Sequence, residues 1–155
     1  MCEINFFLRL KKIEIADTIM GRILAIDYGL KRIGIAVTDP LKIIAQPLTT
    51  INNADIFDFL TKYLTTESVE CLVLGKPMHL DGNDTDATPL VQAFKLELEK
   101  RFPSMPIVMI DERLTSRMAK QSLIDAGYKK QQRQNKKLVD TVAAALILQT
   151  YLETI

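Results

Sequence analysis

Hydrophobic residues in the N-terminal part of the chain cluster into short runs that predict a β-meander. Residues 22–27 and 32–38 are two such runs, joined by a turn that contains Gly29, and they predict two antiparallel strands. A third run follows at residues 42–50. Pro47 within this run lacks the backbone N–H that an interior strand needs, so the third strand is predicted at the edge of a sheet.

After this meander the pattern changes, and stretches with helical spacing alternate with short apolar runs. Ile56, Phe57, Leu60 and Leu64 recur at intervals of three and four, which is typical of one face of a helix. The further predicted elements are, in chain order, a strand at 69–74, a helix with Thr88 as its N-cap and Pro89 in its first turn, a strand at 106–110, a helix capped by Thr115 or Ser116 that stops at Gly127, and a helix at 137–153. A meander followed by alternating helices and strands predicts an α/β fold, in which a mixed five-stranded sheet carries helices on both faces.

The size and composition of the chain favour one folded domain with an N-terminal extension. At 155 residues and 48% hydrophobic, the chain is long enough to bury a complete core. Residues 1–19 alternate between apolar and charged residues and lack the small-residue cleavage site of a signal peptide. The sequence M-G-R-I-L-A-I-D then begins as if Met20 were a start. We therefore expect a domain at residues 20–155 and an extension at 1–19 without recognisable chemistry.

Charge and cysteine usage restrict the classes of partner. The chain has 20 basic and 19 acidic residues, so any surface for nucleic acid must be a local patch rather than a global polycation. Cys2 and Cys71 lie far apart and form no CxxC pair, which disfavours a zinc site and a disulfide framework and favours a reducing cytoplasm. No apolar run approaches the roughly 18 residues of a membrane span.

The end of the first predicted strand carries the most informative polar residues. Asp27 closes an apolar run and is followed by the tight turn Y-G-L-K-R, in which Lys31 and Arg32 are cationic. An acid at a strand end, a glycine turn and adjacent cations suit a site for a metal and a phosphate. An ordinary hairpin in which Asp27 caps the turn explains this segment equally well when it is taken alone.

Two further acids lie at comparable junctions. Glu112 follows the strand at 106–110, and Asp140 is the only acid in the final helix before Glu153. Carboxylates from three separate elements, with no histidine or cysteine among them, favour Mg²⁺ or Mn²⁺ over zinc. Two ions held by shared carboxylates can activate water for phosphodiester hydrolysis.

The local surroundings of Asp140 allow a simpler interpretation. Lys136 and Lys137 precede it by four and three residues, which is the spacing of an intrahelical ion pair. The small residues Ala143 and Ala144 follow at the same spacings and leave space for an ion or a phosphate. For Asp140 in isolation the salt bridge to Lys136 or Lys137 is favoured, and only the combination of the three acids favours the metal site.

Basic residues near the acids are candidate phosphate ligands. The run K-K-Q-Q-R-Q-N-K-K holds five cations and no acid directly before Asp140, which favours contact with a phosphate backbone over a solvated linker. For the cations of the turns, solvation at a helix or turn end is the alternative. The residues predicted to bind nucleic acid are Lys31, Arg32, Lys76, Arg113, Lys129, Lys130, Arg133, Lys136 and Lys137.

Three features remain open at this stage. His79 is the only histidine and has no nucleophile arranged around it, so a surface position is expected. Tyr28 can stack on a base or pack against its own turn. The polar loop at residues 78–87 can close over a substrate or simply connect two elements.

Four motifs, in this order and spacing, resemble the YqgF/RuvX family. They are D-Y-G-L-K-R-I-G-I-A, V-L-G-K-P-M-H-L-D-G, D-E-R-L-T-S and K-L-V-D-T-V-A-A-A-L-I-L, and the resemblance covers residues 20–153. It implies an RNase H-like fold and a nuclease that either matures the 5′ end of pre-16S ribosomal RNA or resolves Holliday junctions. It also implies Asp27, Glu112 and Asp140 as the metal-binding catalytic acids, with Asp111 as a competitor of Glu112. Related junction resolvases carry two acids in the final helix, so a single Asp140 implies that a second ion binds weakly or only with the substrate.

The charge balance refines the expected partner. Without a strong overall positive charge, structured RNA is a better match than a large four-way DNA, and a pre-ribosomal particle is the expected setting. A monomer can trim RNA, whereas resolving a junction requires a symmetric homodimer. A non-catalytic nucleic-acid-binding module is a further alternative. An ATP-handling enzyme is disfavoured, because one domain without a Walker-type glycine loop offers no nucleotide site.

Overall fold

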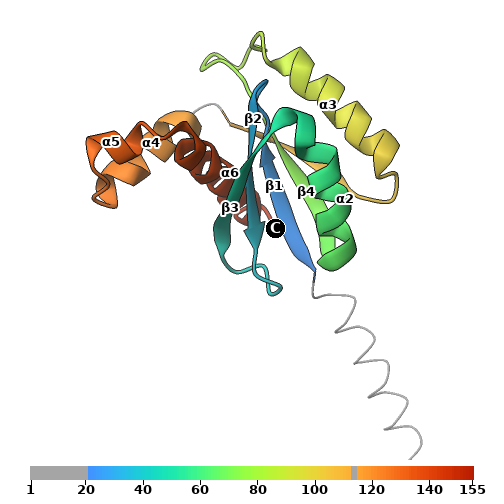
Figure 1. Cartoon of the computed structure of the whole chain (residues 1–155). Coiled ribbons are helices and arrows are strands. Elements are labelled where there is room, and N and C mark those ends of the chain that lie inside the picture. Colours follow the sequence, from blue (N-terminus) through green and yellow to red (C-terminus); the bar gives the residue numbers. More distant parts are fainter. Residues whose placement is uncertain (1–20, 113–114) are drawn as a thin grey trace, which may run out of the picture.

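The computed structural model describes residues 21–112 and 115–155, and its core is a mixed five-stranded sheet (Figure 1). The strands are β1 (Arg22–Asp27), β2 (Arg32–Thr38), β3 (Ala45–Asn52), β4 (Val69–Lys76) and β5 (Ile107–Asp111), in the spatial order β3-β2-β1-β4-β5. The first three strands pair antiparallel, whereas β4 runs parallel to both β1 and β5. This arrangement confirms the predicted sheet, including the edge position of β3.

Helices cover both faces of the sheet, as predicted. Side chains of β1 alternate between the faces, so that Leu24 and Ile26 pack on the side of α2 (Ile56–Thr66) and α3 (Thr88–Arg101). Ile23 and Ala25 join the opposite cluster with α6 (Lys136–Leu152). Figure 1 shows α6 behind the sheet, and α2 and α3 on the opposite side of the sheet. Because β1 is apolar on both faces, it lies at the centre of the fold.

Two local predictions are wrong in detail. The third strand begins at Ala45 instead of residue 42, because the Asp39 carboxylate accepts hydrogen bonds from the amides of residues 41, 43 and 44 and holds them in a loop. Thr88 does not cap α3, since residue 87 occupies the N-cap position. The Thr88 hydroxyl instead donates to the carbonyl of Pro77 over 2.7 Å and ties the helix to the end of β4.

The segment between β5 and α6 folds into two helices beside α6. The first, α4 (Thr115–Asp125), ends just before Gly127, which has a φ of +79° and confirms the predicted stop signal. The second, α5 (Lys130–Arg133), is a short helix within the basic run that was expected to lead directly into α6. In Figure 1 these helices project from the side of the sheet.

Some of the predictions fall on positions that the structure leaves undescribed, namely the extension at residues 1–19 and Arg113. Within the described ranges, none of the helices combines the length and the apolar character that a membrane crossing requires.

Candidate functional site

The acids at the ends of β1 and β5 meet across β4. Asp27 is the last residue of β1, and Glu112 directly follows β5. Gly75 of β4 lies between them, and a Cβ at this position would meet the Glu112 carboxylate and, at 2.6 Å, Cδ1 of Ile147. The missing side chain therefore provides the space in which Glu112 lies over the sheet beside Asp27.

The shared burial of these acids changes their protonation. Burial, together with repulsion from the charge of Asp140, raises the pKa of Asp27 from 3.8 to about 7. Burial is likewise the largest cause that raises the pKa of Glu112 from 4.5 to about 8, and repulsion from Asp27 and Asp111 contributes to the same rise. The site therefore holds closely spaced carboxyl groups that ionise fully only above neutral pH or beside a cation.

Close contact between α6 and β2 places Asp140 beside Asp27. Gly34 of β2 pairs with Asp27 of β1, and a Cβ on Gly34 would fall on the main-chain carbonyl of Asp140. Only glycine allows the helix backbone to approach the strand so closely. The three acids predicted from sequence thus lie at the same end of the sheet, on three different elements.

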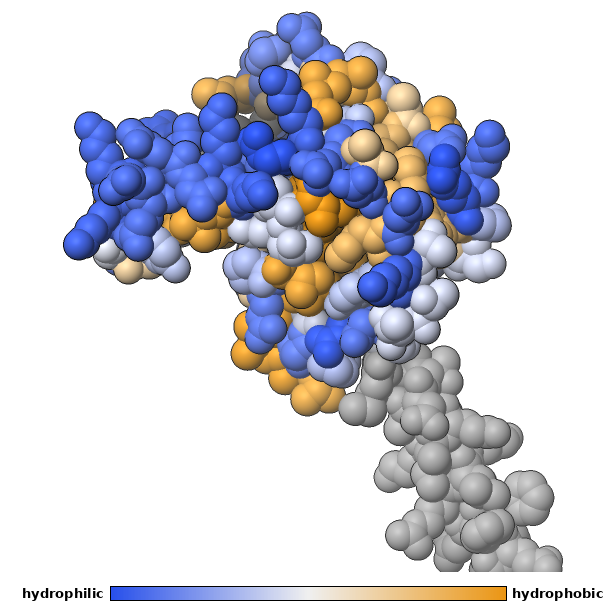
Figure 2. Space-filling view, viewed as in Figure 1, coloured by the Kyte–Doolittle hydropathy of each residue, from blue (hydrophilic) through white to orange (hydrophobic). Residues whose placement is uncertain are grey.

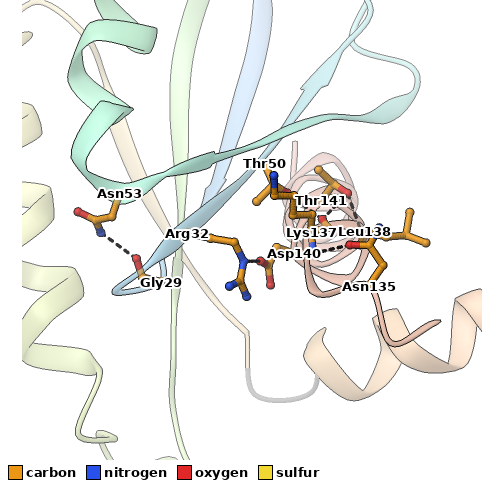
Figure 3. Close-up of polar contacts among 9 residues, drawn as sticks. All are labelled: Gly29, Arg32, Thr50, Asn53, Asn135, Lys137, Leu138, Asp140 and Thr141. Atoms are coloured by element: carbon orange, nitrogen blue, oxygen red, sulfur yellow. Dashed lines mark hydrogen bonds and ion pairs between the residues drawn. The ribbon is translucent and has the colours of Figure 1, made fainter. Parts of the chain in front are cut away.

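Asp140 forms its ion pair with a residue of β2. The Nε atom of Arg32 donates to Oδ2 of Asp140 over 3.0 Å, and about a quarter of each side chain is exposed to solvent (Figure 3). The alternative prediction of an intrahelical pair with Lys136 or Lys137 is therefore wrong. Folding brings the strand cation to the carboxylate, which the local helical spacing does not reveal.

The first turn of α6 is fixed by side chains around Lys137. The Asn135 side chain caps the helix by accepting from the Lys137 amide, and the Lys137 carbonyl accepts from the hydroxyls of Thr50 and Thr141 (Figure 3). These contacts attach the helix to β3. They position Asp140, which follows within the next turn, relative to the sheet.

A basic cavity of about 480 Å³ adjoins the Arg32–Asp140 pair. Its lining residues are Arg32, Lys120, Arg133, Gln134, Lys136, Val139 and Asp140. A second cavity of about 260 Å³ shares Lys120, Arg133 and Gln134 with it and adds Lys130 and Ile124. Figure 2 shows that the surface over α4 and α5 is hydrophilic. We call these two cavities together the basic cleft.

Sequence reasoning missed Lys120 as a member of this cleft. It belongs to α4, and no motif or spacing in the sequence connects that helix with the acids. Contact between α4, α5 and α6 brings it into place.

The other predicted cations have different positions. Lys31, Lys129 and Lys137 are exposed, and Arg113 lies outside the described residues. Lys76 at the end of β4 pairs with Asp84 over 3.2 Å and so anchors the following loop. Sequence reasoning grouped all of these residues, whereas the structure gathers Arg32, Arg133, Lys136 and Lys130 around the cleft.

The loop after β4 is an ordered connection rather than an irregular one. Residues 78 and 84 form an isolated β-bridge, and the His79 amide donates to the Asn83 carbonyl. His79 itself is exposed, as predicted. Tyr28 packs against Phe94 of α3 with a distance of 4.6 Å between ring centroids, so its partner within the fold is the core.

The donor chemistry of the acids fits a hard divalent cation. All the candidate ligands are carboxylate oxygens, the type that Mg²⁺ and Mn²⁺ prefer, and Asp27 accepts no side-chain hydrogen bond from the described residues. Within the described part of the chain, no three acidic, histidine or cysteine side chains are close enough together to hold an ion without adjustment. The acids interact in pairs instead: the charge of Asp140 acts on Asp27, and the charge of Asp27 acts on Glu112.

Sequence comparison relates the whole described domain to known proteins. The model of a family described as "RuvX: Holliday junction resolvase" matches residues 21–154. A Porphyromonas gingivalis protein named as a candidate pre-16S rRNA nuclease is 49% identical over 134 residues, which are 86% of this chain and 97% of the relative. A Bacteroides fragilis protein with the same name is 47% identical over 135 residues, 87% of this chain and 98% of the relative.

Structural comparison agrees with the fold. RuvC from T. thermophilus, solved in complex with a Holliday junction substrate, superposes with a TM-score of 0.52 at 13% identity. The match covers 86% of this chain and 96% of that one. At this identity the likeness concerns the fold alone, which is RNase H-like.

Proposed function

Because the chain belongs to the RuvX family, we propose that it is a metal-dependent nuclease whose substrate is the 5′ end of pre-16S ribosomal RNA. One structural observation supports this proposal most directly. The half-buried Asp27 lies beside Asp140 and also interacts with Glu112, and the basic cleft begins at Asp140. Carboxylates for a cation and cations for a phosphate therefore adjoin, as phosphodiester hydrolysis requires.

We propose that Asp27, Glu112 and Asp140 hold one or two Mg²⁺ or Mn²⁺ ions. When bound, such ions lower the pKa of a coordinated water and neutralise charge on the attacking and leaving oxygens. Asp27 and Glu112 must lose their protons to act as ligands, so their raised pKa values make cation binding compete with protonation.

The basic side chains orient the substrate in this proposal. Arg32 neutralises Asp140 and also lines the cleft, where its guanidinium can pair with a phosphate of the bound strand. Arg133 and Lys136 line the same cavity, and Lys130 extends it along α5. A nucleic-acid strand bound along these residues would have its phosphate backbone directed towards the acids. Lys31, Lys76, Lys129, Lys137 and Arg113 remain proposed contacts outside the cleft.

The names of the relatives favour RNA as the substrate. Both are named for pre-16S rRNA, and a net charge of +1 provides little general attraction for long DNA. The family description favours a second candidate function, the resolution of Holliday junctions. That reaction cuts two strands and so requires a symmetric dimer, whereas a monomer suffices for the RNA. A pre-ribosomal particle in the cytoplasm is the setting that we propose for the enzyme.

Parallel cleavage assays test the proposal. RNA spanning the mature 5′ end of 16S ribosomal RNA and a four-way DNA junction are each incubated with Mn²⁺ or Mg²⁺. We expect metal-dependent cutting of the RNA, and loss of cutting in Asp27→Asn. The matched control is Asp58→Asn, which changes an exposed acid on α2.

Each outcome of these assays has a distinct meaning. Symmetric nicking of the junction alone would support the second function. Binding of RNA without cleavage, unchanged in Asp27→Asn and independent of metal, would contradict the nuclease and indicate a binding module.

A further inference from the structure

The turn after β1, which directly follows Asp27, holds an apolar side chain in solvent. Leu30 is 69% exposed, although it lies only three residues after Asp27 and directly before the cations Lys31 and Arg32. Figure 2 shows an apolar area near the top of the molecule, where Figure 1 places the start of α3. An exposed leucine between a candidate catalytic acid and two cations contributes nothing to the core.

The conformation of this turn is fixed. The Asn53 side chain donates to the Gly29 carbonyl over 2.8 Å (Figure 3), and the Asn53 amide donates to the Lys31 carbonyl over 3.1 Å. A Cβ on Gly29 would collide with the Arg32 carbonyl, so the turn is as tight as glycine permits. The backbone on both sides of Leu30 is therefore attached to the rest of the fold.

Opposite Leu30, the start of α3 completes a mostly apolar cavity of about 370 Å³. Its lining residues are Tyr28, Gly29, Leu30, Asp86, Ala87 and Leu90. The ring of Tyr28 is braced by Phe94, which in turn packs on Phe57 at 5.7 Å. The cavity therefore has a rigid aromatic wall, an exposed leucine on each side and a single charged group.

We propose that this cavity binds one unpaired nucleobase of the substrate, next to the nucleotide whose phosphate reaches the acids. The inference rests on the proposed nuclease function and adds the substrate class, a strand with an unpaired nucleotide beside the cleavage site. A base in a continuous duplex is stacked on both sides and cannot enter between Leu30 and Leu90.

Charge and size both match this occupant. The aromatic wall and the two leucines suit the faces of a base, because stacking on such groups accepts any base. Asp86 can accept hydrogen bonds from the N–H groups on the edge of a base. Lys31 and Arg32, on the other side of Leu30, are placed for the phosphates that flank it. The volume exceeds that of one base and is near the lower end of ligand sites, about 300 Å³.

Binding of abasic substrates tests the inference. A set of RNAs spanning the mature 5′ end of 16S ribosomal RNA carries one abasic nucleotide at successive positions. We expect one position at which the missing base weakens binding by roughly 5- to 150-fold, the range found for the loss of one stacked base. A fully paired duplex of the same sequence should bind more weakly than the strand with unpaired bases.

Two leucine variants provide the matched comparison. In Leu30→Gln the difference between intact and abasic RNA should largely disappear. Leu96→Gln alters a leucine that is 66% exposed on α3 but does not line the cavity, and it should keep the full difference. Asp86→Asn should change which base is preferred at the sensitive position.

The results separate this inference from the proposed function. Two results, each with normal cutting of the RNA, would overturn the base cavity alone. One is equal binding of the RNA whichever position is abasic. The other is a Leu30→Gln variant that still distinguishes intact from abasic RNA as the wild type does. Equal binding of the duplex and the unpaired strand would overturn it as well. If the wild-type chain neither binds nor cuts any of these RNAs, both proposals fail together.

Discussion

The guanidinium of Arg32 and the carboxylate of Asp140 share a hydrogen bond of 3.0 Å, although 108 residues separate them in the chain. This pair joins the first hairpin to the last helix at the point where Asp27 also lies. It gives Asp140 a positive neighbour. Burial raises the pKa of Asp27 and of Glu112, with added repulsion from Asp140 on Asp27 and from Asp27 and Asp111 on Glu112. In this site, therefore, the charge of Asp140 is compensated by an ion pair, whereas ionisation of Asp27 and Glu112 is opposed by their surroundings.

Replacing Arg32 should therefore affect both stability and substrate binding. In Arg32→Gln we expect the free energy of unfolding to fall by about 1 kcal/mol, as for other partly exposed ion pairs. Binding of RNA should weaken as well, because Arg32 lines the basic cleft. Chemical denaturation and equilibrium binding measure the two effects.

The chain offers a matched control for this variant. Arg22 pairs with Glu67 over 2.9 Å, and its side chain is as exposed as that of Arg32, but it lies at the opposite end of β1. Arg22→Gln should lower stability to a similar degree and leave RNA binding unchanged. If both variants lose RNA binding equally, the Arg32 effect reflects general destabilisation and not a place in the cleft.

Removing the charge of Asp27 should stabilise the protein in alkaline solution. Because the pKa is raised from 3.8 to about 7, the folded chain keeps this proton to a higher pH than the unfolded chain. The resulting contribution to stability is complete below about pH 4 and disappears as the pH rises through about 7. Glu112 adds a similar loss up to about pH 8.

In Asp27→Asn we therefore expect a higher Tm than in the wild type at about pH 9, and little difference at about pH 4. A gain of at least about 1 kcal/mol corresponds to roughly 2–4 °C. Thermal unfolding in metal-free buffer, with Asp58→Asn as the control, measures this difference. A lower Tm in Asp27→Asn at both pH values would show that the carboxylate is not under electrostatic stress.

Divalent cations should relieve the same stress in the wild type. Addition of Mn²⁺ at about pH 8 should raise the Tm, since a ligand at 100 times its Kd adds about 2.7 kcal/mol. The increase should be much smaller at about pH 5, where the carboxyl groups are protonated, and in Asp27→Asn. An equal increase in both proteins at both pH values would place the cation elsewhere.

The fold could be predicted from the sequence because its signals are local. Four consecutive apolar residues identify β1 as a central strand, and Pro47 identifies β3 as an edge. The boundary of β3 was missed because the side chain of Asp39 sequesters three backbone amides, a contact that no propensity describes. The domain boundary near residue 20 stays a prediction.

The candidate site could be predicted only in part. Asp27 and Asp140 stand out as acids in apolar surroundings, but the choice between Asp111 and Glu112 depends on which one lies over Gly75. Pairing of Asp140 with Arg32, and the addition of Lys120 to the cleft, arise from contacts between distant segments. Local spacing favoured an intrahelical lysine because it contains no information about those contacts.

The position of Gly75 should be essential for the acids. In Gly75→Ala the added methyl group would meet the Glu112 carboxylate and Ile147, so these side chains must shift from the positions that they hold beside Gly75. We expect a loss of about 1–3 kcal/mol in stability. Metal-dependent cleavage at saturating substrate should fall by about tenfold or more, since each tenfold corresponds to about 1.4 kcal/mol.

Gly127→Ala is the control for this effect. It changes a glycine with φ of +79° and open space around it, and it should cost about 1 kcal/mol without affecting cleavage. Normal activity and normal Mn²⁺ stabilisation in Gly75→Ala would contradict the placement of Glu112 as a ligand.

The basic cleft should determine how strongly RNA binding depends on salt. Each cation that neutralises a phosphate contributes about 0.7 to the slope of log K against log salt for a single strand. Lys120→Ala, Arg133→Ala and Lys136→Ala should therefore each lower the slope by about 0.7 and weaken binding at low salt most. Lys62→Ala removes an exposed charge from α2, on the opposite face of the sheet from α6, and should leave the slope unchanged. If Lys62→Ala lowers the slope as much as the cleft variants, RNA responds to the total charge of the domain and no particular phosphate path leads to the acids.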